Sequence, residues 1–176
     1  MVPRSLPILL LACQGSAPAP QTQALVPASP AGVAEPLHSQ GAVVYVPVYS
    51  SIYVGEGNHV FDLTVTLSIR NTDREHSITV VHADLHDTGG QVVHAYVAEP
   101  TVLGPLASAD IVVRASDTRA GVGGAFVVEW RAGGVVTDPL VQAVMIGSAS
   151  QQGISFVSEG RVLERLAAAE AAGPPG

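Results

Sequence analysis

The sequence predicts an all-β protein, a single antiparallel β-sandwich of the immunoglobulin-like kind with about seven to eight strands. The segment "VFDLTVTLSIR", residues 60–70, alternates apolar and polar side chains. This period of two is typical of a strand with one buried and one solvated face. Other short apolar segments follow, with turn residues between them. No helix-like periodicity separates the strands, which disfavours a parallel α/β sheet.

The expected strands are bounded by residues that favour turns. In chain order, we expect strands at residues 43–49, 60–70, 78–86, 91–97, 110–115, 125–131, 140–147 and 153–158. Asn71-Thr72-Asp73 ends the second strand, Asp87 to Gly90 ends the third, and Gly121 to Gly124 precedes the sixth. The segment "LGPLASADIVV", residues 103–113, predicts a tight corner where the chain crosses between sheets.

The ends of the domain carry two further expectations. Pro47 lies inside the first strand and places it at a sheet edge or a bulge, because proline has no N–H to donate. Residues 41–162 are expected to form the sandwich. The segment "GRVLERLAAAEAAG", residues 160–173, can begin as a strand and close as a short Ala-rich helix, so residues 163–176 are expected to be a short helix or a disordered tail.

The composition limits the classes of function. The chain has 176 residues, enough for one domain with appendages, and 47% of them are hydrophobic while 13% are charged. A sizeable core is therefore expected. All 8 basic residues are Arg, and the formal net charge is −7. Because phosphate binding needs clustered Lys or Arg, we expect no nucleic-acid partner.

The amino terminus resembles a bacterial lipoprotein signal. Arg4 precedes the apolar run Leu6 to Ala12, which is too short to span a bilayer but fits a secretory signal peptide. Leu10-Leu11-Ala12-Cys13 then resembles a lipobox, in which signal peptidase cuts before an S-acylated cysteine. We expect residues 1–12 to be the signal peptide and Cys13 to be the lipid attachment site. The alternative is an ordinary buried cysteine in a signal-like stretch.

Residues 13–40 are expected to be an extended, disordered linker. They are rich in Ala and Pro and carry no periodic pattern. Pro-rich chains extend by ~3.1 Å per residue, so this segment would hold the domain tens of ångströms from a membrane. Gln14 replaces the Asp that favours inner-membrane retention in enteric bacteria. We therefore expect a place in the cell envelope, on the outer membrane facing the periplasm if the cell is Gram-negative.

Four stretches resemble a bacterial family of domains of unknown function, number thirty-one twenty-four (DUF3124). They are "VYVPVYSSIY" (residues 44–53), "LSIRNTD" (67–73), "FVVEW" (126–130) and "AVMIGSASQQGISFVSEGRV" (143–162). The resemblance covers about Gly41 to Val162. It implies a small secreted or lipid-anchored protein and supplies no activity.

The motif "HDTGG" contains Asp87-Thr88-Gly89, the catalytic triplet of aspartic proteases. Such enzymes need two carboxylates that share one proton, here from two copies of the chain. Asp at the first position and Gly at the fourth are also typical of a type I turn, with Gly90 adopting positive φ. We favour the turn. Gly147-Ser148-Ala149-Ser150-Gln151 lacks the closing Gly of a nucleophile elbow, and Ser148 to Gly153 is interpreted as a turn or a polar binding rim.

The histidines of "HADLH" suggest a candidate metal site. If Asp87 to Gln91 closes a hairpin with three loop residues, Asp84 lies opposite His94. The side chains that would then share one face are His82, Asp84, His86 and His94. Three imidazoles and one carboxylate suit zinc or copper. A register shift of one residue would turn His94 inward, and the alternative is a solvated face rich in histidine.

These observations favour a lipid-anchored extracytoplasmic module that binds or scaffolds, and we expect it not to be an enzyme. Its expected partners are the membrane, through acylated Cys13, and another envelope protein or a small ligand. No cofactor is expected in this interpretation. The alternative function is periplasmic transition-metal binding through the His/Asp face, with zinc or copper bound.

Replacing Cys13 by Ser is expected to release the protein from the membrane fraction, because the hydroxyl cannot take the thioether-linked lipid. Cell fractionation followed by immunoblotting measures the distribution, and Ser16→Ala is the matched control. Membrane association that persists in Cys13→Ser would contradict the predicted anchor.

Overall fold

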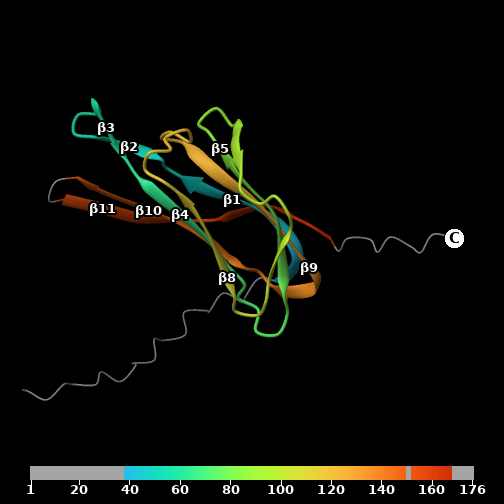
Figure 1. Ribbon diagram of the computed structural model, residues 1–176. Coiled ribbons are helices and arrows are strands. Elements are labelled where there is room, and N and C mark those ends of the chain that lie inside the picture. The colour runs from blue at the N-terminus through green and yellow to red at the C-terminus, as the bar shows by residue number, and fades with distance from the viewer. Residues whose placement is uncertain (1–37, 150–151, 168–176) are drawn as a thin grey trace, which may run out of the picture. The chain divides into compact units, whose positions relative to one another are not determined.

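The computed structural model describes residues 38–149 and 152–167, and these residues form strands without a helix (Figure 1). Every strand pair is antiparallel. The all-β antiparallel class predicted from the alternation is therefore confirmed. The expected signal peptide, Cys13 and most of the linker lie outside the described residues, as do positions 150–151 and the end of the tail.

Two sheets build the domain. The larger has the order β12-β1-β9-β5-β6, with β7 also paired to β5, and the smaller has the order β11-β10-β4-β8. A separate hairpin consists of β2 and β3. The strands are β1 (His38–Val48), β2 (Ser51–Val54), β3 (His59–Asp62), β4 (Thr64–Arg70), β5 (Ile78–His86), β6 (Val92–Ala95), β7 (Thr101–Leu103), β8 (Ser108–Val113), β9 (Gly124–Thr137), β10 (Leu140–Ala149), β11 (Gln152–Glu159) and β12 (Arg161–Arg165).

One hydrophobic core lies between the sheets, and its members alternate along the strands. In β4, Val65, Leu67 and Ile69 are at most 2% exposed, as the alternating pattern predicts. The larger sheet contributes fully or almost fully buried side chains from three of its strands: Val46, Val80, Ala83, Leu85, Phe126, Val128 and Trp130. Burial of each large apolar side chain contributes about 1.5–3 kcal/mol, so this core is the main source of stability.

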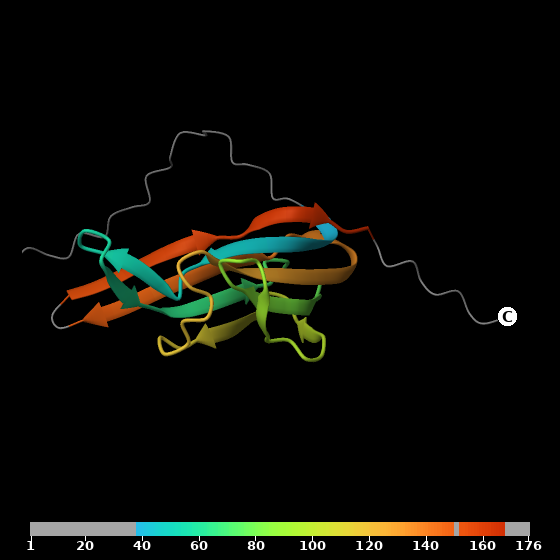
Figure 2. The ribbon, with the colours of Figure 1, turned by 90° about the horizontal axis from the view of Figure 1, so that it is seen from above.

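The last two strands are one nearly continuous stretch that changes sheets at Gly160. β11 pairs with β10 of the smaller sheet, and β12 pairs with β1 of the larger one (Figure 2). A Cβ atom at Gly160 would lie 2.6 Å from Val44 Cγ1 and 2.8 Å from the Val141 carbonyl oxygen, so only glycine fits this crossing. β12 leaves β1 at Tyr45, and beyond that point β1 has β9 as its one paired neighbour. Pro47 lies in this part of β1, which agrees with the edge position expected for it.

Each of the eight predicted strands is present, but the structure has more strands than predicted. The predicted strand at 60–70 is split at Leu63, and β2 and β7 were not expected. The strand considered at the start of the segment from Gly160 is present as β12, which extends to Arg165, three residues past the point where the helix or tail was expected to begin. Its edge pairing with β1 holds this segment in the sheet. The predicted corner at 103–113 is confirmed, since β7 and β8 belong to different sheets.

Asn71 is a buried amide that joins the end of β4 to two other segments. Asn71 is only 2% exposed. The Nδ2 group donates to the carbonyl oxygens of His76 (2.8 Å), Leu103 (3.1 Å) and Gly104 (2.9 Å). Its Oδ1 accepts the backbone N–H of Asp73 at 3.0 Å. The amide thus replaces the ladder hydrogen bonds that the chain loses where β4 and β7 end.

Asp73 extends this network to the β9–β10 turn. Its Oδ2 accepts the backbone N–H of Thr137 at 2.9 Å, and its Oδ1 accepts those of Glu75 and His76 at 2.9 and 2.8 Å. The Thr137 bond first, and then the other two, hold the pKa of Asp73 far below its ordinary value of 3.8, although desolvation opposes them. Thr72 adds a bond from Oγ1 to the Asp138 carbonyl oxygen at 2.6 Å. We call Asn71, Thr72 and Asp73 the corner network.

Removal of the Asn71 side chain is expected to destabilise the protein by about 2–4 kcal/mol, because it leaves three carbonyl groups and one N–H without their partner. Urea denaturation of Asn71→Ala measures the change. Asn58→Ala, at an exposed position in the β2–β3 turn, is the matched control and should change the unfolding free energy by less than about 0.5 kcal/mol. Equal effects of the two substitutions would contradict the role of the corner network.

The lowered pKa of Asp73 predicts how stability depends on pH. The unfolded chain binds a proton at this carboxylate near pH 3.8, whereas the native chain keeps the carboxylate ionised to lower pH. Stability from this group is therefore present above that value and lost as pH falls below it. In Asp73→Asn, we expect a lower urea midpoint at neutral pH and a shallower fall between about pH 4 and pH 2.

The exposed Asp62→Asn variant is the control for the pH series and should keep the wild-type slope. If Asp73→Asn lost stability on acidification as steeply as the wild type, the carboxylate would not be the group responsible.

Candidate functional site

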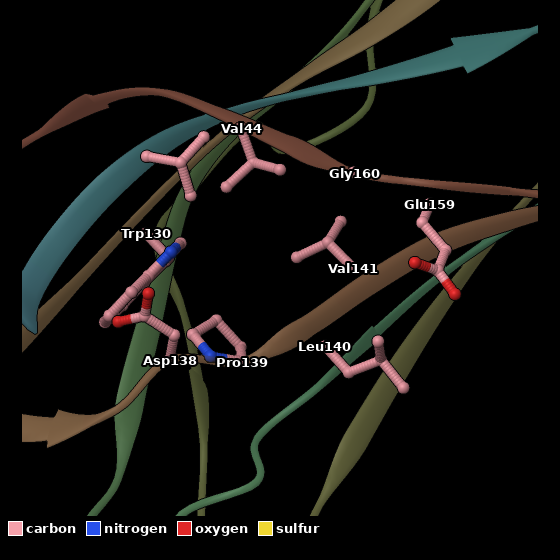
Figure 3. Close-up of a pocket in the computed structure, with 9 residues that line it drawn as sticks. Val44, Trp130, Asp138, Pro139, Leu140, Val141, Glu159 and Gly160 are labelled. Carbon is pink, nitrogen blue, oxygen red and sulfur yellow. The ribbon is translucent and has the colours of Figure 1, made fainter. Parts of the chain in front are cut away.

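A cavity of about 170 Å³ opens between the two sheets beside the Gly160 crossing (Figure 3). We call it the edge cavity. Its lining residues are Val44, Trp130, Asp138, Pro139, Leu140, Val141, Glu159, Gly160 and Val162. Its wall combines apolar side chains with two carboxylates, those of Asp138 and Glu159.

The apolar wall is rigid because it belongs to the core. Val44, Trp130 and Val141 are at most 5% exposed, and Trp130 is paired in register with Ala42 of β1 and Val80 of β5. Trp130 is also the single tryptophan of the chain. Among the residues that the structure describes, its indole N–H has no hydrogen-bond partner, so this donor is available to a group in the cavity.

The sheet crossing creates the cavity. Gly160 donates its N–H to the Val141 carbonyl oxygen at 2.8 Å, which fixes the crossing chain against β10. Ser158 on the preceding strand donates its hydroxyl to the Pro47 carbonyl oxygen. Because Gly160 has no side chain, the crossing backbone packs directly against Val44 and Val141, and the cavity lies beside this contact, where the chain passes from one sheet to the other.

The two carboxylates of the cavity differ in their partners. Asp138 Oδ2 forms an ion pair with Arg165 Nη1 at 2.9 Å, and its Oδ1 accepts a hydrogen bond from Ser39 Oγ at 2.7 Å. Glu159 is exposed, and it forms no ion pair within residues 38–149 and 152–167. Figure 3 shows the two carboxylates on opposite sides of the cavity. Glu159 therefore supplies the uncompensated negative charge at the rim.

The predicted metal-binding face is not assembled. His82 and His86 project from β5 with Asp84 between them, but His94 pairs with Leu85 and Asp84 pairs with Ala95. The predicted pairing of Asp84 with His94 was therefore wrong. Within the described residues, no group of three or more His, Cys, Asp or Glu side chains is arranged to hold a metal ion.

A one-residue bulge between Leu85 and His86 causes this difference. The predicted three-residue loop is present, since the Asp87 N–H bonds to the Gln91 carbonyl oxygen at 2.9 Å, but Val93 is then inserted into the ladder. Arg119 donates from Nη1 to the Val93 carbonyl oxygen at 2.9 Å and is itself paired with Asp117 at 2.7 Å. A side chain of the β8–β9 loop thus stabilises the bulge by a hydrogen bond to its backbone.

The bulge also serves the core. It turns Tyr96 inward, where its ring lies 5.6 Å from that of Phe126, and His94 stacks edge-on against Tyr96 at 4.4 Å. In the unbulged register the small Ala95 would have faced the core in place of Tyr96. Burial, followed by the nearby Asp117 carboxylate, raises the pKa of Tyr96.

The "HDTGG" segment forms the predicted turn. Gly90 has φ of 80° and donates its N–H to the Asp87 carbonyl oxygen at 2.9 Å. Asp87 Oδ1 accepts the N–H of Gln91 at 2.9 Å, so this carboxylate closes the hairpin. The β10–β11 serines include Ser148, which is exposed, while Ser150 and Gln151 lie outside the described residues.

Sequence reasoning missed both the corner network and the edge cavity. The network had a local signal, the buried-strand end "RNTD", in which Asn and Asp two residues apart can bond backbone groups. The cavity had none, because its lining comes from segments as distant as Val44 and Val162, which only the sheet crossing brings together.

The fold and the cavity define a small antiparallel β-sandwich domain with a cavity at one edge. Within this class, the chain belongs to the family described as "Protein of unknown function (DUF3124)", whose model matches residues 41–163. The resemblance drawn from four sequence stretches is thereby confirmed. No curated protein and no solved structure matches the chain. Within the described residues, no helix has the length and apolar character needed to cross a membrane.

Proposed function

We propose that this protein is a lipid-anchored extracytoplasmic binding module whose edge cavity takes a short aliphatic group that carries or adjoins a positive charge. The observation that carries the proposal is the combination of apolar walls with an unpaired carboxylate, Glu159, at the rim of a preformed cavity. Preformed apolar pockets with a few placed polar groups are the usual form of small binding sites.

The size of the cavity supports a small occupant. An apolar cavity of about 150 Å³ accommodates benzene, so a space of about 170 Å³ is sufficient for a chain of four to six heavy atoms. Each buried methylene contributes about 0.8 kcal/mol, roughly a fourfold gain in affinity. A rim ion pair with Glu159 adds about 0.2–1 kcal/mol because it remains partly solvated.

The address of the module rests on the amino-terminal residues. The apolar run before Cys13 and the Pro-rich stretch after it support acylation at Cys13 and a tether to the cell envelope. A binding role fits this arrangement, because the tether would hold a preformed cavity at a distance from the membrane. The metal-binding alternative lacks a supporting observation, because the bulge at Val93 separates His94 from Asp84.

Titration with n-butylammonium tests the proposed site, and the fluorescence of Trp130 measures it because no other tryptophan contributes. We expect saturable binding with a Kd in the millimolar range, as befits a ligand of about five heavy atoms. Propylammonium should bind about fourfold more weakly, and butyrate, which carries the opposite charge, should not bind.

The matched charge variants are Glu159→Gln at the rim and Glu164→Gln on β12. The first should weaken butylammonium binding about two- to fivefold, and the second should leave it unchanged. If butyrate and butylammonium gave the same response, or if Glu159→Gln behaved as Glu164→Gln does, the proposed recognition would be contradicted.

A further inference from the structure

Leu106 is unusual in two respects: it is a non-glycine residue with positive φ, and it is a large apolar residue exposed to solvent. It is the one non-glycine residue with positive φ, 58°, among the described residues. It occupies the third position of the Gly104–Ala107 turn, which the Ala107 N–H closes on the Gly104 carbonyl oxygen at 3.1 Å. A turn with Pro at its second position and positive φ at its third normally places Gly or Asn there. Leu106 is nevertheless present, and its side chain is 68% exposed.

The corner network holds this leucine in place. Asn71 Nδ2 bonds the carbonyl oxygens of Leu103 and Gly104, and the Leu106 N–H donates to the Asp73 carbonyl oxygen at 3.2 Å. The Asn71 N–H donates to the Ala107 carbonyl oxygen at 2.9 Å. The backbone on both sides of Leu106 is therefore fixed before any partner arrives. Docking of Leu106 therefore requires no further ordering of this loop.

We propose that Leu106 of one copy docks into the edge cavity of a second copy of this chain. The proposal rests on the proposed function, since it names the occupant of the same cavity. A leucine side chain has four carbon atoms, and a cavity of about 170 Å³ accommodates it with room to spare. Leu106 is 68% exposed, so its side chain lies outside its own core and is free to contact a partner.

Charge complementarity supports a second copy as the occupant. Arg74 follows Asp73, whose carbonyl oxygen holds Leu106. Arg74 is exposed, and it forms no ion pair within the part of the chain that the structure describes. Within residues 38–149 and 152–167, Glu159 at the rim of the cavity likewise forms no ion pair. When Leu106 enters the cavity of the partner, Arg74 pairs with the partner's free carboxylate. Arg74 thus supplies the positive charge that adjoins the aliphatic group in the proposed recognition.

The position of the two features permits a mutual exchange. Leu140 of the cavity pairs in register with Arg70, and Arg70 pairs with Ser108, two residues after Leu106. Leu106 and the edge cavity therefore lie at the same end of the smaller sheet. In two copies related by a twofold axis, each copy inserts its Leu106 into the cavity of the other, and such an interface closes as a dimer.

Sedimentation velocity over a range of concentrations tests the proposal, using the full chain with Cys13→Ser. We expect a monomer–dimer equilibrium and a Trp130 fluorescence change that follows it. Leu106→Gly should raise the dimer Kd about ten- to hundredfold. Its melting temperature should not fall, because glycine adopts positive φ without strain. Leu163→Gly, on β12 and 60% exposed, is the matched control and should leave the Kd unchanged.

A charge exchange tests the predicted contact separately. Arg74→Glu should weaken the dimer, and Glu159→Arg in the same chain should restore it. Excess n-butylammonium should dissociate the wild-type dimer by occupying the cavity.

Three results would overturn the proposal: a monomer at all concentrations, a dimer indifferent to Leu106→Gly, or a dimer that forms without any Trp130 response. Butylammonium binding by a chain that stays monomeric would overturn the docking of Leu106 and leave the proposed function standing. If the dimer depended on Leu106 but the chain bound no butylammonium, the proposed cation recognition would be contradicted. In that case a change in Trp130 fluorescence on dimerisation would support the docking of Leu106, and the lack of one would overturn it.

Discussion

The buried hydrogen bonds of Asn71 and Asp73 are the constraint on which the rest of the structure depends. Strands of a sandwich end at its corners, and there the backbone loses its ladder partners. These two side chains supply hydrogen-bond partners to the backbone at the end of β4, before the start of β5, at the β7–β8 corner and at the β9–β10 turn. Both sheets are thus joined at one end by polar side chains, although the core holds them together by apolar contact.

The chemistry of the corner explains why one position is an amide and the other a carboxylate. Three carbonyl oxygens surround the side chain of Asn71, so a donor is required there, and its NH₂ group reaches all of them. Three backbone N–H groups converge on Asp73, which therefore requires an acceptor with two oxygens. Asparagine at the second position would offer one acceptor and an unwanted donor. The lowered pKa of Asp73 follows from this convergence of N–H dipoles.

The alternation of apolar residues was enough to predict the strands and most of the core, because a half-buried strand imposes a period of two on its sequence. The register was harder. The loop after Asp87 was predicted correctly, yet the bulge at Val93 depends on Arg119, a residue 26 positions away that binds its carbonyl oxygen. The extent of β12 was not predicted, because an exposed edge strand buries too little to show a pattern that marks where it ends. Local signals predict local structure, and long-range contacts decide the face that a side chain occupies.

The edge cavity and the Leu106 corner have a common origin in the way the two sheets are joined. At one edge the chain crosses between the sheets at Gly160, where the lack of a side chain lets the backbone pack against Val44 and Val141, and the edge cavity lies beside this crossing. At the β7–β8 corner the chain crosses again, and a left-handed residue projects outward. A sandwich must make such crossings, and each one interrupts the alternation of inward and outward side chains. The edge cavity and the exposed Leu106 side chain therefore both lie where the chain passes between the sheets, and Thr72, which donates to the Asp138 carbonyl oxygen, links the corner network to a residue of the cavity wall.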